Sequence, residues 1–318
     1  MCCENLELYS LIVPVYNNSE SIDALLEVSG TLNGQLEGKL ELVFVVDGSP
    51  DDSWAQLNAK LPGCSFRSRL LLHSRNFGAF AAIRTGMEYA SGPLFSVMAA
   101  DLQEPPELVL TFFKELKEGN CDVVFGCRES REDPGLSRLF SALFWGFYRK
   151  FIIKEMPPGG VDIFGCNLVV RNQVIRLSEA NSSLIAQLFW VGFVRKMCPY
   201  GRRKREAGKS AWTFRKKMNY LLDSVFSFTD LPIKVFLLIG LLGMLVSITV
   251  GTVALVAKLA GLIQVSGYTG LILTVSFFGA TTILGLGIVG AYAHRTFENS
   301  KQRPLSIVMK DDSYSKIR

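Results

Sequence analysis

Polar side chains follow five apolar, strand-like runs of the sequence. The runs are residues 8–15, 40–47, 70–73, 94–100 and 122–127. The polar residues at or just after their carboxyl ends are Asn17, Asp47, Arg75, Asp101 and Arg128. A single polar residue in such a place often only forms a turn. Five consecutive strand ends that all carry one indicate a binding site for a polar or charged ligand.

Helical patterns separate these runs and predict how the strand ends are positioned. Residues 19–32, 79–90 and 106–118 have the periodicity of helices. Alternating strands and helices predict an α/β fold with a parallel or mixed sheet sandwiched by helices. Ligands bind such sheets beyond the carboxyl ends of the strands. Neither a Walker P-loop nor a GxGxxG motif follows any of these strand-like runs, which disfavours a P-loop ATPase and a dinucleotide-binding fold.

Two uncharged runs predict membrane-spanning helices. The chain has 318 residues, of which 49% are apolar, and residues 235–257 and 268–293 contain no charged side chain. Each run exceeds the roughly 20 residues that cross about 30 Å of hydrocarbon as a helix. A pair of buried soluble helices is the alternative. Small residues at four-residue spacing, which let membrane helices approach closely, indicate a hairpin or packing in an oligomer: Gly243, Ser247, Gly251, Gly287 and Ala291.

Basic residues predict the orientation of these helices. Residues 202–217 carry eight Lys or Arg, and His294, Arg295, Lys301 and Arg303 follow the second run, whereas only Lys258 lies between the runs. The positive-inside rule then places both termini in the cytoplasm. Residues 1–7 lack the basic start of a signal peptide, so we expect the first two thirds of the chain to stay there. Beside a membrane helix, the basic segment favours anionic lipid or a phosphate substrate over nucleic acid.

Two aromatic and basic stretches predict helices that lie at the membrane surface. Residues 137–153 repeat Leu and Phe at helical spacing and add Trp145, Tyr148 and basic residues. This composition favours an interfacial helix, and a core helix is the alternative. Residues 212–230 are similar.

Seven motifs in order resemble the family 2 glycosyltransferases, in particular their polyprenyl-phosphate glycosyltransferase subgroup with dolichol-phosphate mannose synthases and bacterial undecaprenyl-phosphate glucosyltransferases. The motifs are IVPVYN (12–17), VDGSPDDS (46–53), RNFGAFAAIRTGMEYA (75–90), ADLQEPPEL (100–108), GGVDIF (159–164), REAGKSAWTFRKK (205–217) and DSVFSFTDLP (223–232). The resemblance covers nearly the whole chain. It implies a GT-A-type mixed sheet flanked by helices, with interfacial amphipathic helices and a C-terminal two-helix transmembrane hairpin.

The resemblance also implies roles for individual residues. Asp101 and Gln103 would bind Mg²⁺ or Mn²⁺, which bridges the diphosphate of the donor and stabilises the leaving group. Asp162 matches the carboxylate usually proposed as the catalytic base, so Asp101 and Asp162 are the expected catalytic residues. The residues expected to bind the nucleotide-sugar are Pro14, Tyr16, Asn17, Asp47, Arg75, Gly78 and Ala100.

Basic residues are expected to meet the phosphates of the substrates. Arg128, Arg131, Arg202 and Arg205 match basic positions of the family, where a planar fork of donors suits bidentate binding, and Ser210 lies in the matching segment. Each assignment has a simpler alternative: an Asp after a strand can cap a helix, Asp162 can be a turn residue, and the arginines can face anionic lipid.

Two departures from the family pattern affect what the resemblance implies. The family usually has Asp-Ala-Asp before Leu-Gln, and here Ala99 replaces the first Asp, which removes a carboxylate near the expected metal. The usual Asp-Asp-Gly-Ser begins with Val46 in this chain, so the nucleotide preference does not carry over.

The expected activity is inverting transfer of one sugar from a nucleotide-sugar, with a UDP-sugar foremost, to a polyisoprenyl phosphate, with undecaprenyl phosphate foremost. The main alternative is a catalytically impaired nucleotide-sugar-binding subunit that partners a lipid-sugar flippase, which only Ala99 supports. A processive polysaccharide synthase would normally add a QxxRW-type motif and more membrane helices. A transporter would need a charged path through the membrane.

The sequence predicts four parts. Residues 1–200 form a cytoplasmic GT-A domain, 201–232 a basic interfacial segment, 233–295 the two transmembrane helices, and 296–318 a cytoplasmic tail. The expected location is the cytoplasmic (inner) membrane, as a multi-pass protein that contacts lipid and binds no nucleic acid. A homo-oligomer is a further hypothesis, in which residues 304–308 add a strand to a neighbouring subunit.

Overall fold

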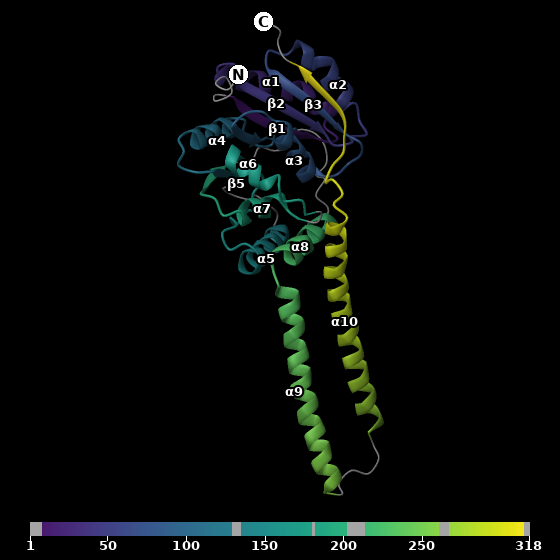
Figure 1. Ribbon diagram of the computed structural model, residues 1–318. Helices are drawn as coiled ribbons and strands as arrows, with labels where there is room; N and C mark the ends of the chain where they lie inside the picture. Colours follow the sequence, from purple (N-terminus) through teal and green to yellow (C-terminus); the bar gives the residue numbers. More distant parts are fainter. Residues whose placement is uncertain (1–7, 129–134, 180–181, 202–213, 261–266, 315–318) are drawn as a thin grey trace.

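The described part of the chain contains one mixed sheet of eight strands in the order β7-β5-β6-β4-β1-β2-β3-β8 (Figure 1). The computed structural model describes residues 8–128, 135–179, 182–201, 214–260 and 267–314. The strands are β1 (Tyr9–Val15), β2 (Leu40–Val46), β3 (Arg67–His73), β4 (Leu94–Val97), β5 (Val123–Arg128), β6 (Ile163–Asn167), β7 (Arg195–Tyr200) and β8 (Val308–Tyr314).

Two antiparallel strands make the sheet mixed. β1 runs parallel to β2 and β4, β2 parallel to β3, and β5 parallel to β7. β6 lies antiparallel between β4 and β5, and β8 lies antiparallel along β3. The predicted mixed α/β sheet is therefore confirmed, and the five strands expected from the sequence are β1 to β5.

Alternating side chains of the central strands supply two hydrophobic cores, one on each face of the sheet. In β2, Val43 and Val45 face one core, whereas Leu42, Phe44 and Val46 face the other. Because successive residues of a strand point to opposite faces, a fully apolar strand such as β2 needs a cover on both sides.

Helices provide this cover. α1, α2 and α4 contribute to the second core, and α3, α5, α6 and α7 contribute to the first. The helices expected at residues 19–32, 79–90 and 106–118 are confirmed as α1, α3 and α4. The helix bounds are α1 (Ile22–Gln35), α2 (Ser53–Lys60), α3 (Ala79–Tyr89), α4 (Glu107–Lys117), α5 (Gly135–Phe151), α6 (Leu168–Val174), α7 (Leu184–Trp190), α8 (Phe214–Phe228), α9 (Leu231–Leu259) and α10 (Tyr268–Ser300).

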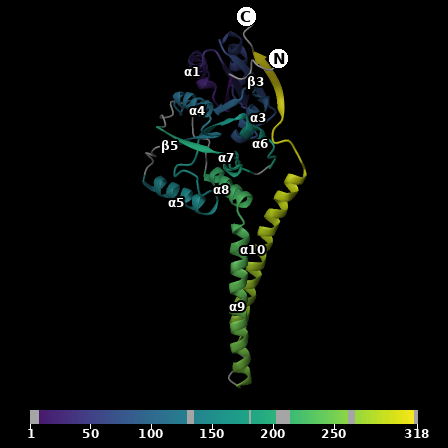
Figure 2. The ribbon, with the colours of Figure 1, turned by 60° about the vertical axis from the view of Figure 1, so that its left-hand side comes forward.

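The two apolar helices α9 and α10 extend side by side away from the sheet (Figures 1 and 2). Their most apolar segments are Leu231–Val250 and Phe277–Ser300, with mean hydropathies of 2.4 and 1.4, and only 6% of each such segment is buried inside the protein. Core helices of a soluble protein would be mostly buried. Apolar helices of this length and exposure indicate association with a membrane.

Aromatic side chains of one apolar helix pack on glycines of the other. A Cβ atom added to Gly285 of α10 would lie 2.1 Å from the ring of Phe236 in α9, and one added to Gly243 of α9 would lie 3.3 Å from Phe278 in α10. Gly287, which the spacing argument singled out, has no atom within 4 Å of such a position. The close contact therefore uses Gly285 rather than Gly287.

α5 and α8 lie at the end of the sheet domain from which the apolar helices extend (Figure 1). On α5, Tyr148 is fully buried, whereas Leu143 is 62% exposed, so one face of this helix packs on the core and another is open. The Tyr148 ring stacks on Tyr220 of α8 at 5.9 Å. Arg295 of α10 forms an ion pair with Asp223 of α8 at 2.7 Å. The interfacial role expected for both helices stays a prediction.

The C-terminal tail forms the edge strand of its own sheet, and the hypothesis of a strand added to a neighbouring subunit stays a prediction. The strand is β8, which begins at Val308, the last residue of the 304–308 segment, and it pairs with β3 of the same chain. Arg69 of β3 donates to both carboxylate oxygens of Asp311 at 2.7 and 2.6 Å. The chain returns from α10 beside the open edge of β3, and a strand edge with unpaired backbone groups readily accepts such a partner.

Candidate active site

One edge of the sheet collects the candidate residues. The carboxyl ends of β1 to β5 share this edge because these strands are parallel, and the antiparallel β6 and β8 begin there. The topology therefore brings together the residues that follow the five strands. It adds Asp162, directly before β6, and Tyr200, the last residue of β7.

The loops after β1 and β2 are joined by a hydrogen-bond network. The Asn17 N–H donates to Ser49 Oγ at 2.8 Å, and Ser49 Oγ donates to Asp51 at 2.6 Å. The Ser19 N–H donates to the second oxygen of Asp51 at 2.9 Å. Burial opposes ionisation of this carboxyl, but the hydrogen bonds from Ser49, Ser53 and the Ser19 amide lower its pKa to about 2. Asn17 has a left-handed backbone with φ of 57°, which lets the chain turn into this network.

Asp47 is buried and holds the start of α3. Its side chain is 3% exposed. One carboxylate oxygen accepts from the Phe77 N–H and contacts His73 Nδ1, both at 2.8 Å, and the other oxygen accepts from the Gly78 N–H at 2.8 Å. The contact with nucleotide predicted for Asp47 stays a prediction. What the geometry establishes is that this carboxylate fixes the Phe77–Gly78 segment.

Other residues predicted to bind the nucleotide-sugar surround this loop with different exposures. Tyr16 is 41% exposed, Pro14 is half-buried and Ala100 is buried. Arg75 is exposed, and its guanidinium lies 4.0 Å from the centre of the Phe77 ring. The Tyr16 ring and the Arg75 guanidinium are thus both accessible at this edge.

The segment after β4 presents Asp101 in a strained turn. Leu102 has φ of 52°, which is unusual for a bulky residue, and such strain often occurs at functional sites. The Gln103 N–H donates to Asp101 Oδ1 at 3.4 Å. The Asp101 side chain is half-buried, and Gln103 is 8% exposed. Ala99, where the family has Asp, offers a methyl group and no ligand atom.

A half-buried ion pair occupies the edge at β5 and β6. Arg128 donates to the two oxygens of Asp162 at 2.5 and 2.7 Å, and the Tyr200 hydroxyl donates to Asp162 at 2.7 Å. Burial alone would lower the pKa of Arg128, but the bonds to Asp162 raise it above its ordinary value. Burial and then the charge of Asp162 raise the pKa of Tyr200. Tyr200 therefore stays protonated and remains a donor to the carboxylate.

The turn before Asp162 requires glycine at position 160. Gly160 has φ of 76°, and a Cβ atom there would lie 2.2 Å from the Trp145 ring of α5. We expect Gly160→Ala to lower the free energy of unfolding by about 2–4 kcal/mol, from backbone strain and the clash with the ring. The effect is measured by thermal unfolding in detergent, in which Gly160→Ala is expected to have a lower Tm than the unmodified chain.

Gly159→Ala is the matched control for that variant. A Cβ at Gly159 would meet Arg128 atoms at 3.7 and 3.8 Å, an ordinary contact, so its Tm is expected to stay near that of the unmodified chain. Equal Tm values for the two variants would contradict the steric argument.

Four predicted phosphate-binding residues lie outside the described residues, namely Arg131, Arg202, Arg205 and Ser210. Sequence reasoning missed two residues of this edge, His73 and Tyr200. His73 is the last residue of β3, and Tyr200 is the last residue of β7. A search for polar residues at strand ends would have found His73 if the last residue of each strand had been counted. It would have found Tyr200 if β7 had also been recognised.

Comparison with known proteins identifies the family. The sequence model described as "Glycosyl transferase family 2" matches residues 10–177. CsbB of Bacillus subtilis (strain 168), which carries a glycosyltransferase name, is 33% identical over 297 residues, covering 93% of this chain and 90% of the relative. The chain therefore belongs to glycosyl transferase family 2, and it is a glycosyltransferase.

Two further similarities concern a phage protein and a solved structure. The bactoprenol glucosyl transferase of Shigella phage SfV is 28% identical over 303 residues, covering 95% of this chain and 98% of the relative. The mannosyltransferase PcManGT from Pyrobaculum calidifontis, solved with GDP-Man and Mn²⁺, is 15% identical with a TM-score of 0.48, covering 91% of this chain and 84% of that chain.

Proposed function

We propose that this enzyme transfers one sugar from a nucleotide-sugar, foremost a UDP-sugar, to a polyisoprenyl phosphate, foremost undecaprenyl phosphate, at the cytoplasmic face of the inner membrane. The observation that carries the proposal is one sheet edge that combines a half-buried carboxylate, Asp101, with a guanidinium–carboxylate pair, Arg128–Asp162, in a domain attached to two exposed apolar helices. Similarity to bactoprenol glucosyl transferases over nearly the full length supports the choice of acceptor.

Asp101 and Gln103 would hold a divalent cation together with the donor diphosphate. Among the described residues no group of three or more His, Cys, Asp or Glu side chains could hold a metal ion. A single carboxylate and an amide oxygen fit Mg²⁺ or Mn²⁺, which commonly take one or two carboxylates plus substrate phosphates rather than a full protein cage. When bound, the ion would neutralise charge that develops on the leaving diphosphate.

The loops after β1 and β2 would bind the nucleotide part of the donor. Tyr16 and Arg75 are exposed there and offer a ring and a cation. Asn17 shapes the β1 loop through its bond to Ser49. Asp47 would act from beneath, because its oxygens already bind the Phe77 and Gly78 amides and are not open to a ligand.

Arg128 and Asp162 would position the acceptor phosphate. A phosphate oxygen is already anionic near pH 7 and needs no strong base to attack the anomeric carbon. Asp162 is engaged by a bidentate arginine and by Tyr200, so its two oxygens already accept three hydrogen bonds. We infer that Asp162 orients the Arg128 guanidinium toward the acceptor phosphate. We also infer that attack of the phosphate oxygen on the anomeric carbon inverts the configuration of that carbon.

The apolar helices would hold this domain at the lipid surface. In this proposal residues 1–200 and the returning strand β8 form the cytoplasmic catalytic part, residues 201–232 lie at the membrane surface, and both termini are cytoplasmic. The clustered Lys and Arg residues before α9 and the ion pair of Arg295 with α8 support this orientation.

Transfer of label tests the proposed function. Purified protein in detergent is given undecaprenyl phosphate, Mn²⁺ or Mg²⁺, and each of a panel of radiolabelled nucleotide-sugars. We expect one donor to label the organic-extractable lipid, and omission of the acceptor to abolish this label. Nucleotide binding without transfer from any donor would overturn the proposal in favour of a nucleotide-binding subunit without activity.

A further inference from the structure

A buried histidine lies beneath the proposed donor site. His73 is one of two histidines in the chain, and its side chain is 0% exposed. Its Nδ1 lies 2.8 Å from Asp47 Oδ1, and its Nε2 lies 3.0 Å from Thr85 Oγ1 on α3. Both ring nitrogens are therefore occupied by polar partners inside the core. Nothing in the proposed mechanism uses this ring directly.

The chain of contacts continues to the C-terminal tail. Thr85 Oγ1 lies 2.7 Å from Ser306 Oγ, and the Ser74 N–H donates to the carbonyl oxygen of Ile307 at 3.0 Å. Ser306 stands two residues before β8 on the segment that returns from the second apolar helix. Four side chains, from Asp47 to Ser306, thus connect the donor edge of the sheet with that segment.

The donor and acceptor roles along these four side chains follow from Asp47, the carboxylate at one end. A carboxylate only accepts hydrogen bonds, so a His73 ring that carries a single proton donates from Nδ1 to Asp47. Nε2 then accepts from the Thr85 hydroxyl, and the Thr85 oxygen accepts from Ser306. These proton positions are assigned from the network. Asp47, His73 and Thr85 are buried, and each needs its partner because an unmatched polar group in a low-dielectric interior is costly.

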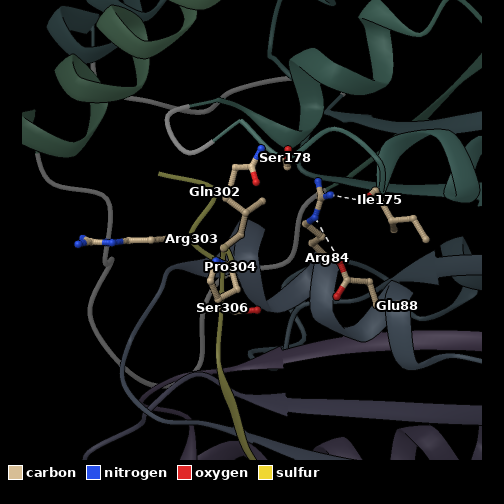
Figure 3. A pocket seen from close by; sticks show the side chains of 9 residues that line it. Arg84, Glu88, Ile175, Ser178, Gln302, Arg303, Pro304 and Ser306 are labelled. Carbon is tan, nitrogen blue, oxygen red and sulfur yellow. Dashed lines mark hydrogen bonds and ion pairs between the residues drawn. The ribbon is translucent and has the colours of Figure 1, made fainter. Parts of the chain in front are cut away.

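Ser306, the last residue of this series of contacts, borders a pocket between the tail and α3. Figure 3 shows Ser306 and Pro304 of the tail opposite Arg84 and Glu88 of α3. The pocket measures about 380 Å³. Arg84 does not bridge it: its guanidinium donates to the carbonyl oxygens of Val174 and Ile175 and pairs with Glu88. Next to this gap, the Ser306–Thr85 bond is a specific side-chain connection from the tail to α3.

We propose that Ser306, Thr85 and His73 are positioning residues for the donor: through Asp47 they hold the Phe77–Gly78 segment in the form that binds nucleotide. The inference rests on the proposed function, because it assumes that this edge is the donor site. It makes the tail after the second apolar helix a support of the donor site, through the Ser306–Thr85 bond. Preorganised support of this kind lowers the entropic cost of binding.

Kinetics of a Ser306→Ala variant test the proposal. We expect the donor KM to rise about fivefold, the effect of one lost hydrogen bond, while the acceptor KM stays within about twofold. Ser306→Thr keeps the hydroxyl and is expected to restore the donor KM. Ser313→Ala is the matched control, since Ser313 is an exposed serine of the same tail. Equal donor KM values for Ser306→Ala and Ser313→Ala would overturn the inference.

Nuclear magnetic resonance of ¹⁵N-histidine gives an independent readout. With His73 and His294 as the only histidines in the sequence, the spectrum reports the tautomer of each ring. We expect His73 as the Nδ1–H form, with an Nε2 signal that moves in Ser306→Ala and not in Ser313→Ala. An unchanged His73 signal in Ser306→Ala would overturn the connection. Failure of the unmodified protein to bind nucleotide or transfer sugar would instead overturn the proposed function.

Discussion

Asp101→Ala is expected to reduce sugar transfer by at least about 1,000-fold, because the residue supplies the one carboxylate expected to hold the cation on the donor diphosphate. Ala99 has already removed a neighbouring carboxylate that the family usually carries. The chain therefore has little to compensate for the loss of Asp101. The measurement is the rate of label transfer into lipid at saturating Mn²⁺, and then at tenfold higher Mn²⁺.

An exposed aspartate provides the control for this result. Asp23 on α1 is 82% exposed in its side chain and pairs with Lys60, so Asp23→Ala is expected to transfer sugar at the unmodified rate. The Tm of Asp101→Ala is measured as well, because this variant loses the bond that Asp101 Oδ1 accepts from the Gln103 N–H. If Asp101→Ala retained more than about a tenth of the activity, the assigned cation site would be wrong.

Asp162→Asn is expected to lower kcat/KM for the acceptor by about 100-fold or more, the second largest effect. Asparagine cannot accept two charge-assisted bonds from Arg128, and its N–H₂ group would face the donors of the guanidinium. Arg128, whose side chain is 17% exposed, would lose its partner and its orientation. Steady-state kinetics with varied acceptor, together with nucleotide binding by calorimetry, measure the effect.

Two further measurements distinguish a positioning role of Asp162 from general misfolding: the nucleotide affinity of Asp162→Asn and the activity of Tyr200→Phe. Nucleotide affinity of Asp162→Asn is expected to stay within about twofold of the unmodified value, since β1 and β2 carry the donor loops. Tyr200→Phe removes one of the bonds to Asp162 and keeps the ring, so a loss of only about fivefold is expected. Transfer by Asp162→Asn at a rate close to that of Tyr200→Phe would mean that Asp162 neither orients Arg128 nor acts as a base.

Local patterns in the sequence determined the elements and their general place. The apolar run of β2 predicts a strand that is covered on both faces, and both cores are present. Uncharged runs of more than 20 residues predict α9 and α10, because only their length and composition matter. Polar residues after successive strands predict a common edge, because parallel strands end on the same side. These features depend on residues close together in the chain.

The tertiary structure alone decided which distant segments meet. β6 enters between β4 and β5 in the opposite direction, which brings Asp162 to Arg128 and Tyr200. β8 returns from the apolar helices to β3 and brings Ser306 to Thr85. Asp47 meets His73 at the end of β3 and the Gly78 N–H at the start of α3. Strand order and direction are set by the total packing of the sheet, and no local periodicity encodes them.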